Sequence, residues 1–282
     1  VDVLERVVLS KPYFDRAGVI VAVRDGRLLG FAHAGFGCDE SGKLTVERGA
    51  TCMLMVAPQE RSGSLGQDLL GRSESYLQAA GSQSLTGGPV HPTDPFYLGL
   101  YGGSELPGVL ASDHWLLELY QQAGYDEVER RVILQRDLAG FRPPVDRNLM
   151  QIRRGFQVEA ELDPAPRSWW EACTFGQTDR TRFHLRPRRG SESSGQVTYW
   201  DLEPLASSWG SHAAGLVQLE VAPDRAPTGA EMFLNAESIR QLQTEGVTLV
   251  EVQLGVGDRA RRGLYERLGF QQVEEGIVLH KS

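Results

Sequence analysis

The sequence has few cysteines and no long apolar run. Its three cysteines, Cys38, Cys52 and Cys173, are too few and too widely spaced for a disulfide framework or a zinc site, so we expect no metal ion and a reducing, cytoplasmic location. No apolar stretch approaches the roughly 18 residues of a membrane-spanning helix, and no signal peptide opens the chain, so we expect no membrane association.

Positive charge is also scarce. The chain has 29 Lys and Arg residues against 37 Asp and Glu residues, which gives a net charge of −8. Because proteins gain most of their affinity for nucleic acid by neutralising phosphates, this balance argues against a nucleic-acid partner. An apolar share of 41% and a charged share of 23% are ordinary for a soluble globular protein and too apolar for a disordered one.

Signatures of several enzyme classes are missing. The sequence contains neither the G-x-S-x-G elbow nor the H-E-x-x-H helix of common hydrolases, and no G-x-x-x-x-G-K-[ST] nucleotide-binding loop. The histidines show no metal-ligand spacing; they are His33, His91, His114, His184, His212 and His280.

Two short motifs each occur twice and in the same order, which indicates an internal repeat. Val-Ala-Pro at 56–58 and 221–223 follows a strand-like run and precedes an arginine, a small-residue loop and an amphipathic helix. Leu-Tyr-Gln-Gln-Ala-Gly-Tyr at 119–125 corresponds to Leu-Tyr-Glu-Arg-Leu-Gly-Phe at 264–270. Since the length already favours two domains, we predict two copies of one domain, residues 1–140 and 147–282.

The two predicted domains differ in length at two places. The chain begins with Val1 rather than Met, and the first copy lacks an equivalent of the strand at 156–162 and the helix after it, so we expect the first domain to be incomplete at its N-terminus. The first copy also has a longer connection between its motifs, over 87–110. We expect a linker over 137–148, where Pro143-Pro144 disfavours a helix or a central strand.

Periodicity and turn signals predict the secondary structure of both copies. In the first copy they predict helices over 2–9, 65–80 and 112–123, a hairpin of 18–23 and 27–36 around Asp25-Gly26, and strands over 50–56 and 131–136. In the second they predict strands over 156–162, 216–221, 248–254 and 276–280, a hairpin of 182–187 and 196–202, and helices over 169–174, 231–244 and 259–268.

The segment 55–70, Met-Val-Ala-Pro-Gln-Glu-Arg-Ser-Gly-Ser-Leu-Gly-Gln-Asp-Leu-Leu, carries the clearest chemical signal. Small residues after the strand let the backbone approach a ligand closely, and the free N–H groups of a helix N-terminus attract anions. A plain strand-to-helix turn would explain the same residues equally well. The candidate anion cradle, suited to a pyrophosphate, consists of Arg61, Ser62, Gly63, Ser64, Leu65 and Gly66.

These residues resemble the GCN5-related N-acetyltransferases. That family's pyrophosphate-binding motif is V-x-P-x-x-R/Q-x-x-G-x-G/A; the matching residues are Val56, Pro58, Arg61 and Gly66, with Ser64 in place of the first glycine. Its later motif, an Asn followed by A-x-x-L-Y-x-x-x-G-F, is matched by Leu119, Tyr120, Gly124 and Tyr125, with Asp113 and Leu116 replacing the Asn and the Ala. In the second copy the later motif is well kept, but Thr228 and Ala230 take the glycine positions of the loop and Arg225 comes one residue early.

The resemblance implies two tandem acyl-CoA N-acyltransferase domains with an α/β (α+β) fold, each a mixed, mostly antiparallel sheet flanked by helices. It further implies that acetyl-CoA binds the first copy, with its pantetheine paired to the backbone of Met55 and Val56 and its pyrophosphate on the cradle. A primary amine of an unidentified, small-molecule acceptor would attack the thioester directly. Tyr120 would protonate the departing thiolate, because a phenol of pKa ~10 is a weaker acid than a thiol.

Several alternatives stay open at this level. Both copies could instead form a non-catalytic acyl-CoA-binding or interaction protein, or the second copy could be the active one through Arg225 and Tyr265. Glu47 and Glu220 are candidate general bases. The connection over 87–110 either shapes the acceptor site or packs against the other half of the chain.

Overall fold

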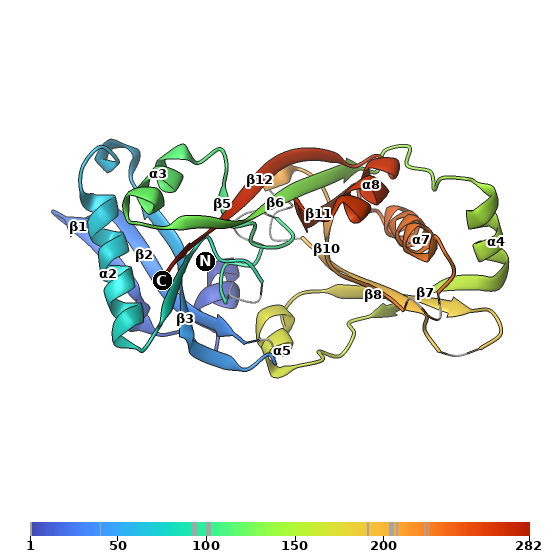
Figure 1. Ribbon diagram of the computed structural model, residues 1–282, viewed down its shortest axis with the longest axis horizontal. Helices are drawn as coiled ribbons and strands as arrows, with labels where there is room; N and C mark the ends of the chain where they lie inside the picture. The colour runs from blue at the N-terminus through green and yellow to red at the C-terminus, as the bar shows by residue number, and fades with distance from the viewer. Residues whose placement is uncertain are drawn as a thin grey trace. The chain divides into compact units, whose positions relative to one another are not determined.

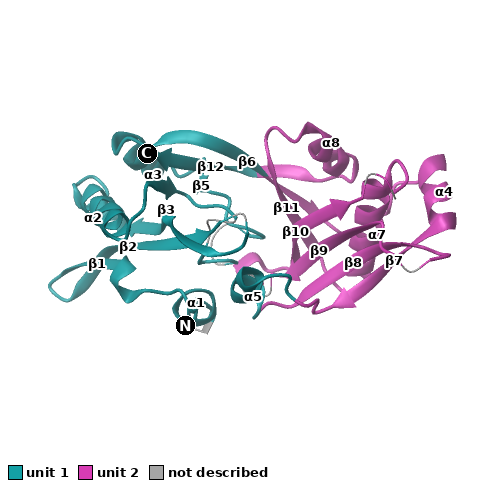
Figure 2. Ribbon diagram, turned by 60° about the horizontal axis from the view of Figure 1, so that its bottom comes forward, with its two compact units in different colours: residues 1–132, 166–177, 274–282 teal, residues 133–165, 178–273 magenta. Residues whose placement is uncertain are grey.

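The chain forms two compact units, each assembled from segments that lie far apart in the sequence (Figure 2). The computed structural model describes residues 2–39, 41–91, 95–99, 103–190, 192–202, 206, 208–222, 224 and 226–282. Unit 1 comprises Val1–Val132, Pro166–Gln177 and Glu274–Ser282, and unit 2 comprises Ile133–Ala165 and Thr178–Val273. The compact units and the sequence repeat are therefore divided differently, because residues 166–177 and 274–282 pack with the first copy.

The sheet of unit 1 has the strand order β1-β2-β3-β4-β12. Its strands are β1 (Val19–Arg24), β2 (Arg27–Cys38), β3 (Leu44–Val56), β4 (Ser84–Gly87) and β12 (Gln271–Lys281), and the short β5 (Val109–Leu110) also pairs with β12. Only the β3–β4 pair among these is parallel. The β1–β2 hairpin turns at Asp25 and Gly26, which both have positive φ (51° and 74°), as the Asp-Gly signal predicts.

Two layers cover the sheet of unit 1. On one face, α2 (Leu65–Ala79) and α3 (His114–Gln122) pack on residues such as Ala32, Leu54 and Val56; Figure 1 shows α2 beside β1 and β2. Residues from the chain's start and from the 87–110 connection form a second cluster with Ala50 and Cys52. The remaining helical segments of unit 1 are α1 (Asp2–Leu4), η1 (Glu5–Leu9), η2 (Arg16–Gly18), η3 (Pro58–Glu60) and α5 (Trp169–Phe175).

Unit 2 repeats this plan with the strand order β11-β10-β9-β8-β7. Its strands are β7 (Phe156–Leu162), β8 (Arg180–Pro187), β9 (Gly195–Asp201), β10 (Ala213–Val221) and β11 (Leu249–Gly255), and its helices are α4 (Arg147–Gly155), α7 (Ala230–Thr244) and α8 (Arg259–Arg267). Here too one pair, β10–β11, is parallel and the others are antiparallel. Strand β6 (Asp126–Asp137), like β12, begins in one unit and ends in the other.

The expected fold class, a mixed and mostly antiparallel sheet flanked by helices, is confirmed. The predicted elements are present, and several strands are longer than predicted. The sequence did not predict β4, β5 or α4. Helix α4 begins inside the predicted linker because Asp146, just after Pro143-Pro144, accepts a hydrogen bond from the Leu149 N–H (2.8 Å) and so caps a new helix. Among the described residues, no helix is long and apolar enough to cross a membrane.

Candidate functional site

Strands β3 and β4 of unit 1 separate halfway along β3. Their parallel pairing joins Arg48–Thr51 to Ser84–Gly87 and ends at the pair Thr51–Gly87, which we call the fork. Strand β4 stops there, whereas β3 continues to Val56 and stays paired with β2 on its other side. Beyond the fork, β4 therefore supplies no partner for the backbone groups along one side of β3.

A pocket of about 590 Å³, including open solvent at its mouth, lies beside β3 from the fork onward. Strand β3 lines the pocket from Thr51 to Met55, and Arg61 of the cradle also contributes. The other lining residues come from the 87–110 connection and α3; they are Gly88, Pro89, Leu106, Gly108, Val109, Asp113, Trp115, Leu116 and Tyr120.

Tyr120 sits at the fork. Its side chain is 1% exposed, and a Cβ added to Gly87 would lie 2.5 Å from its ring, so only glycine fits opposite it. Burial raises the pKa of Tyr120 well above the usual value of a phenol. Tyr120 therefore carries a proton at neutral pH. It lines the same pocket as Arg61.

The cradle has the expected form of a helix N-terminus. The first hydrogen bond of α2 runs from the Asp68 N–H to the Ser64 carbonyl (2.9 Å), so the N–H groups of Leu65, Gly66 and Gln67 precede it. The Gly63 N–H, in contrast, already donates to the Glu60 carbonyl (3.2 Å). The donors offered to a ligand thus lie in the first turn of the helix rather than at Gly63.

Trp115 of α3 buttresses the cradle, a role that the sequence did not predict. Its indole N–H donates to the Arg61 carbonyl (3.0 Å), and the Arg61 guanidinium lies 4.8 Å above its ring, within cation–π range. A Cβ added to Gly66 would lie 2.9 Å from the same ring. The close approach of α2 and α3 therefore leaves no room for a side chain at position 66, whether or not a ligand also requires a glycine there.

Two carboxylates lie close to the cradle. Glu60 forms an ion pair with Arg24 (3.1 Å), and Asp68 accepts a hydrogen bond from the Ser64 hydroxyl (3.2 Å). Arg61 hydrogen-bonds the Val56 carbonyl through its Nε (3.3 Å) while lining the pocket. Arg61 is thus the cation available at the pocket to an anionic ligand, and the carboxylate of Glu60 is already compensated.

Asp113 preserves the helix cap at the start of α3. Its carboxylate accepts a hydrogen bond from the Leu116 N–H (3.2 Å), as the family's Asn would. Asp113 is also the carboxylate among the described residues that line the pocket. No group of three or more His, Cys, Asp and Glu side chains in the described part of the chain is placed to hold a metal ion.

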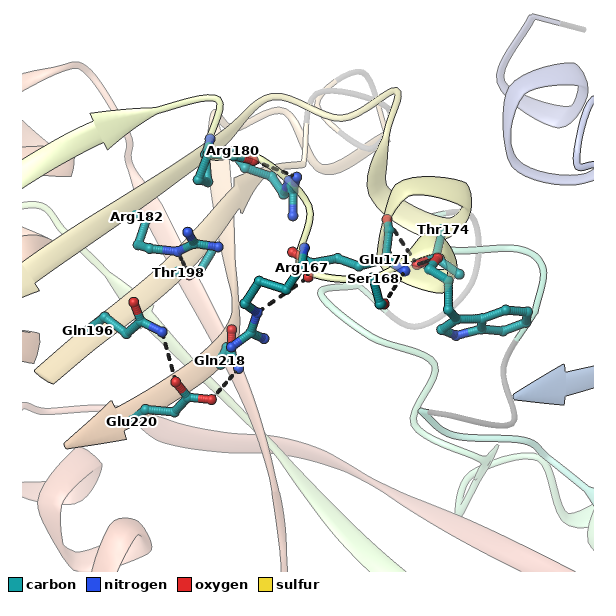
Figure 3. Close-up of polar contacts among 12 residues, drawn as sticks. Arg167, Ser168, Glu171, Thr174, Arg180, Arg182, Gln196, Thr198, Gln218 and Glu220 are labelled. Atoms are coloured by element: carbon teal, nitrogen blue, oxygen red, sulfur yellow. Dashed lines mark hydrogen bonds and ion pairs between the residues drawn. The ribbon is translucent and has the colours of Figure 1, made fainter. Parts of the chain in front are cut away.

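Neither candidate general base lies at the pocket. Glu47 is exposed and precedes the fork on β3, about 13 Å from Thr51 at the usual rise of a strand. Glu220, on β10 of unit 2, accepts hydrogen bonds from Gln196 (2.7 Å) and Gln218 (2.5 Å), as Figure 3 shows. The geometry gives neither residue a role in proton transfer at the fork.

The 87–110 connection has two distinct parts. Phe96 and Tyr97 are buried and pack against His33, whose Nδ1 lies 2.8 Å from the Tyr97 hydroxyl. Burial lowers the pKa of His33 to about 4, so it is neutral at neutral pH. Gly88, Pro89, Leu106, Gly108 and Val109, at the two ends of the connection, line the pocket instead. That this connection shapes the acceptor site stays a prediction, and Tyr101 lies outside the described residues.

The corresponding cradle of unit 2 differs from that of unit 1. Helix α7 begins at Ala230 as α2 begins at Leu65; the helix starts therefore align Gly229 with Ser64 and Glu231 with Gly66. Counted from Val221, the motif spacing also gives Gly229 and Glu231, so the alignment with Thr228 and Ala230 was wrong by one residue because it was counted from Arg225. Asn148 donates to the Thr228 carbonyl (2.8 Å) and so occupies this loop.

The fork of unit 2 also differs. Pairing of β10 with β11 ends at Gly215–Glu251, and Tyr265 donates a hydrogen bond to Asn235 (3.2 Å) of α7. Arg261, which replaces Leu116 in the motif, donates to the Leu219 carbonyl (3.2 Å) of β10 beyond the fork. One backbone carbonyl of β10 beyond the fork is thus engaged by the chain's own arginine. Arg225 lies outside the described residues.

Comparison with known proteins shows the fold. No family model matches the chain, and no curated protein matches it. Similar solved structures are a tandem GNAT protein from the clavulanic acid biosynthesis pathway (TM-score 0.65, 13% identity, 93% of this chain and 81% of that one) and a GCN5-related N-acetyltransferase from Sphaerobacter thermophilus (0.61, 15%, 93% and 79%). A GCN5-related glucosamine N-acetyltransferase region of a fungal multi-domain GH3 β-N-acetylglucosaminidase is also similar (0.66, 16%, 91% and 32%). The chain has the tandem GCN5-related N-acetyltransferase fold.

Proposed function

We propose that the protein is an N-acetyltransferase whose unit 1 moves an acetyl group from acetyl-CoA to a primary amine of a small-molecule acceptor. The observation that carries this proposal is the pocket at the fork, which brings Tyr120, the open edge of β3 and Arg61 together. The tandem acetyltransferase fold supports acyl transfer as the chemistry.

The residues of unit 1 suit acetyl-CoA as the donor. The backbone of Met55 and Val56, beyond the fork, offers hydrogen bonds to the amides of pantetheine. Arg61 and the N–H groups that precede the first hydrogen bond of α2 suit the pyrophosphate. The residues proposed to bind the donor are Met55, Val56, Arg61, Ser62, Ser64, Leu65 and Gly66, whereas the Gly63 N–H already donates to the Glu60 carbonyl.

In the proposed reaction, the amine nitrogen attacks the thioester carbonyl carbon. A C–N bond forms, the C–S bond breaks, and Tyr120 gives its proton to the departing sulfur. The nitrogen loses a proton as the amide forms, and the Tyr120 phenolate regains one, so that no proton is consumed overall. Tyr120 suits the role of general acid because its phenol is buried and protonated.

We propose that unit 2 supports the fold and binds no acyl-CoA. Glu231 stands where unit 1 has Gly66, and Arg261 donates a hydrogen bond to a carbonyl of β10 beyond the fork. The Glu231 carboxylate, in the first turn of α7, forms an ion pair with Arg261 (3.6 Å), so the chain supplies its own anion where a pyrophosphate would bind.

The second candidate function is acyl-CoA binding without catalysis. Two departures from the family motif in unit 1 favour it: Ser64 in place of a glycine and Asp113 in place of the Asn. Asp113 still caps α3, however, and the N–H donors in the first turn of α2 remain. These two substitutions therefore leave the proposed binding groups of unit 1 in place.

Calorimetric titration with acetyl-CoA separates these proposals. We expect one binding site per chain, about tenfold weaker binding in Arg61→Ala, and unchanged binding in Arg72→Ala, an exposed arginine of α2 away from the pocket. Release of free thiol would then be measured with a panel of amino sugars, polyamines and amino acids. Absence of binding at millimolar acetyl-CoA rejects both candidates, and binding without thiol release for any amine favours the second.

A further inference from the structure

Arg61 is held by three contacts, and two of them come from Trp115. The Trp115 indole N–H donates to the Arg61 carbonyl (3.0 Å), and the Arg61 guanidinium lies 4.8 Å from the centroid of the indole ring. The third contact is the hydrogen bond from the Arg61 Nε to the Val56 carbonyl (3.3 Å). Among the described residues, the two terminal nitrogens of Arg61 have no hydrogen-bond or ion-pair partner. Their N–H groups are therefore available at the pocket that Arg61 lines.

These contacts prepare Arg61 to bind an anion. An arginine loses rotamer freedom when a ligand orders it, and this loss weakens binding unless the protein has already ordered the side chain. Arg61 is exposed to solvent, yet its carbonyl, its Nε and the face of its guanidinium are all engaged. Since the indole lies against the face, the N–H groups in the guanidinium plane stay free for the oxygens of a phosphate.

Trp115 is itself held firmly in place. A Cβ added to Gly66 would lie 2.9 Å from its ring, so the indole packs directly on the first turn of α2. Trp115 belongs to α3, the helix that carries Tyr120, and both side chains line the pocket. The side chain that orders Arg61 is therefore fixed between two helices of unit 1.

Unit 2 has neither partner of this contact. The spacing of the first motif places Ala226 at the position of Arg61. The spacing of the later motif places Ala260 at the position of Trp115. The arginine and the tryptophan thus occur together in the unit that has the pocket, and both are replaced by alanine in the other unit. This joint replacement supports a shared role in unit 1.

We infer that Trp115 is a positioning residue for the acyl donor, because it holds Arg61 at the pocket in a conformation ready to bind a pyrophosphate. Unit 1 should therefore prefer thioesters of coenzyme A, which carry a pyrophosphate, to thioesters of pantetheine, which do not. Trp115 contributes to this preference through Arg61. This inference rests on the proposed binding of acetyl-CoA by unit 1.

A double-mutant cycle tests the inference, with acetyl-CoA affinity measured by calorimetry. Trp115→Leu should weaken binding about fivefold and Arg61→Ala about tenfold. Because Trp115 acts through Arg61, the double variant should also bind only about tenfold more weakly than the wild type. Trp115→Phe keeps an aromatic face for the guanidinium and the packing on Gly66, so it should lose only about twofold. Trp169→Leu, at a tryptophan of α5 outside the pocket lining, is the matched control and should bind like the wild type.

A donor without a pyrophosphate gives the second comparison. With S-acetylpantetheine, kcat/KM for thiol release should agree within about twofold among the wild type, Trp115→Leu and Arg61→Ala. A loss of about 50-fold in the double variant, which is the product of the single losses, would show that Trp115 acts independently of Arg61 and overturn the inference. An equal loss with both donors in Trp115→Leu would overturn it as well, because the ring would then only shape the pocket.

Both of these results leave the proposed function standing. Absence of acetyl-CoA binding by the wild-type protein at millimolar concentration instead rejects the proposed function, and the inference with it.

Discussion

The two units carry the same motif helix but differ where their parallel strands part. In unit 1 the helix presents Leu116 and Tyr120 to a pocket, and the fork is Thr51–Gly87. In unit 2 the helix presents Arg261, which hydrogen-bonds the strand backbone, and the fork is Gly215–Glu251. The Leu-Tyr motif thus marks the fold in both units, whereas we propose that the residues at and beyond the fork decide whether a ligand can enter.

The largest effect is expected from removing the hydroxyl of the motif tyrosine. Tyr120→Phe should lower kcat about 100- to 1,000-fold without changing acetyl-CoA affinity, because it removes a general acid and no binding contact. The matched variant Tyr265→Phe should leave kcat unchanged and cost about 1 kcal/mol of stability through its lost hydrogen bond to Asn235. Steady-state kinetics and thermal unfolding check both; normal turnover in Tyr120→Phe would disprove the assignment.

The next largest expected difference is in stability at low pH, where unit 1 should lose stability before unit 2. Since burial holds the pKa of His33 at about 4, below its unfolded value of ~6.5, the folded state binds fewer protons. Stability contributed by the neutral His33 is complete above pH ~6.5 and falls by about 3 kcal/mol as the pH drops toward 4. In unit 2, a hydrogen bond from His184 (2.8 Å) lowers the pKa of Glu161, so the stability from this contact is lost only as the pH falls below about 4.5.

Hydrogen exchange measured between pH 7 and 4.5 checks this difference. Protection in β2 and β3 should fall before protection in β7 and β8. A simultaneous loss in both units would contradict it.

An exchange of residues between the units gives the next largest effect. Leu116→Arg in unit 1 should weaken acetyl-CoA binding about 30-fold, because the new guanidinium can bond the β3 backbone as Arg261 bonds that of β10. Arg261→Leu should leave binding to unit 1 unchanged. Calorimetry measures both variants, and unchanged affinity in Leu116→Arg would show that the open edge of β3 is not used.

The smallest effects separate the two cradle glycines. Gly66→Ala places a Cβ 2.9 Å from the Trp115 ring, so it should cost about 1–2 kcal/mol of stability. Gly63→Ala places its Cβ no closer than 3.6 Å to the Glu60 carbonyl and should leave stability nearly unchanged. Chemical denaturation compares them; equal stabilities would mean that α2 and α3 pack less tightly at Gly66 than the structure shows.

The sequence predicts those parts of the site that are local in the chain. Arg61, the first turn of α2 and Tyr120 follow from two motifs, and the strands and helices around them follow from their periodicity. The fork does not, because Thr51 and Gly87 meet through strand pairing across a helix, and β4 has only four residues. Trp115 and Arg261 were missed because they stand at positions that the family motif leaves variable or fills with a small residue.

A structure of the protein with coenzyme A bound tests the central claim most directly. We predict one molecule per chain, with its pantetheine along β3 beyond Thr51 and its pyrophosphate at the first turn of α2. Coenzyme A bound along β10, or bound in both units, would contradict the claim that the residues at the fork confine acyl-CoA to unit 1.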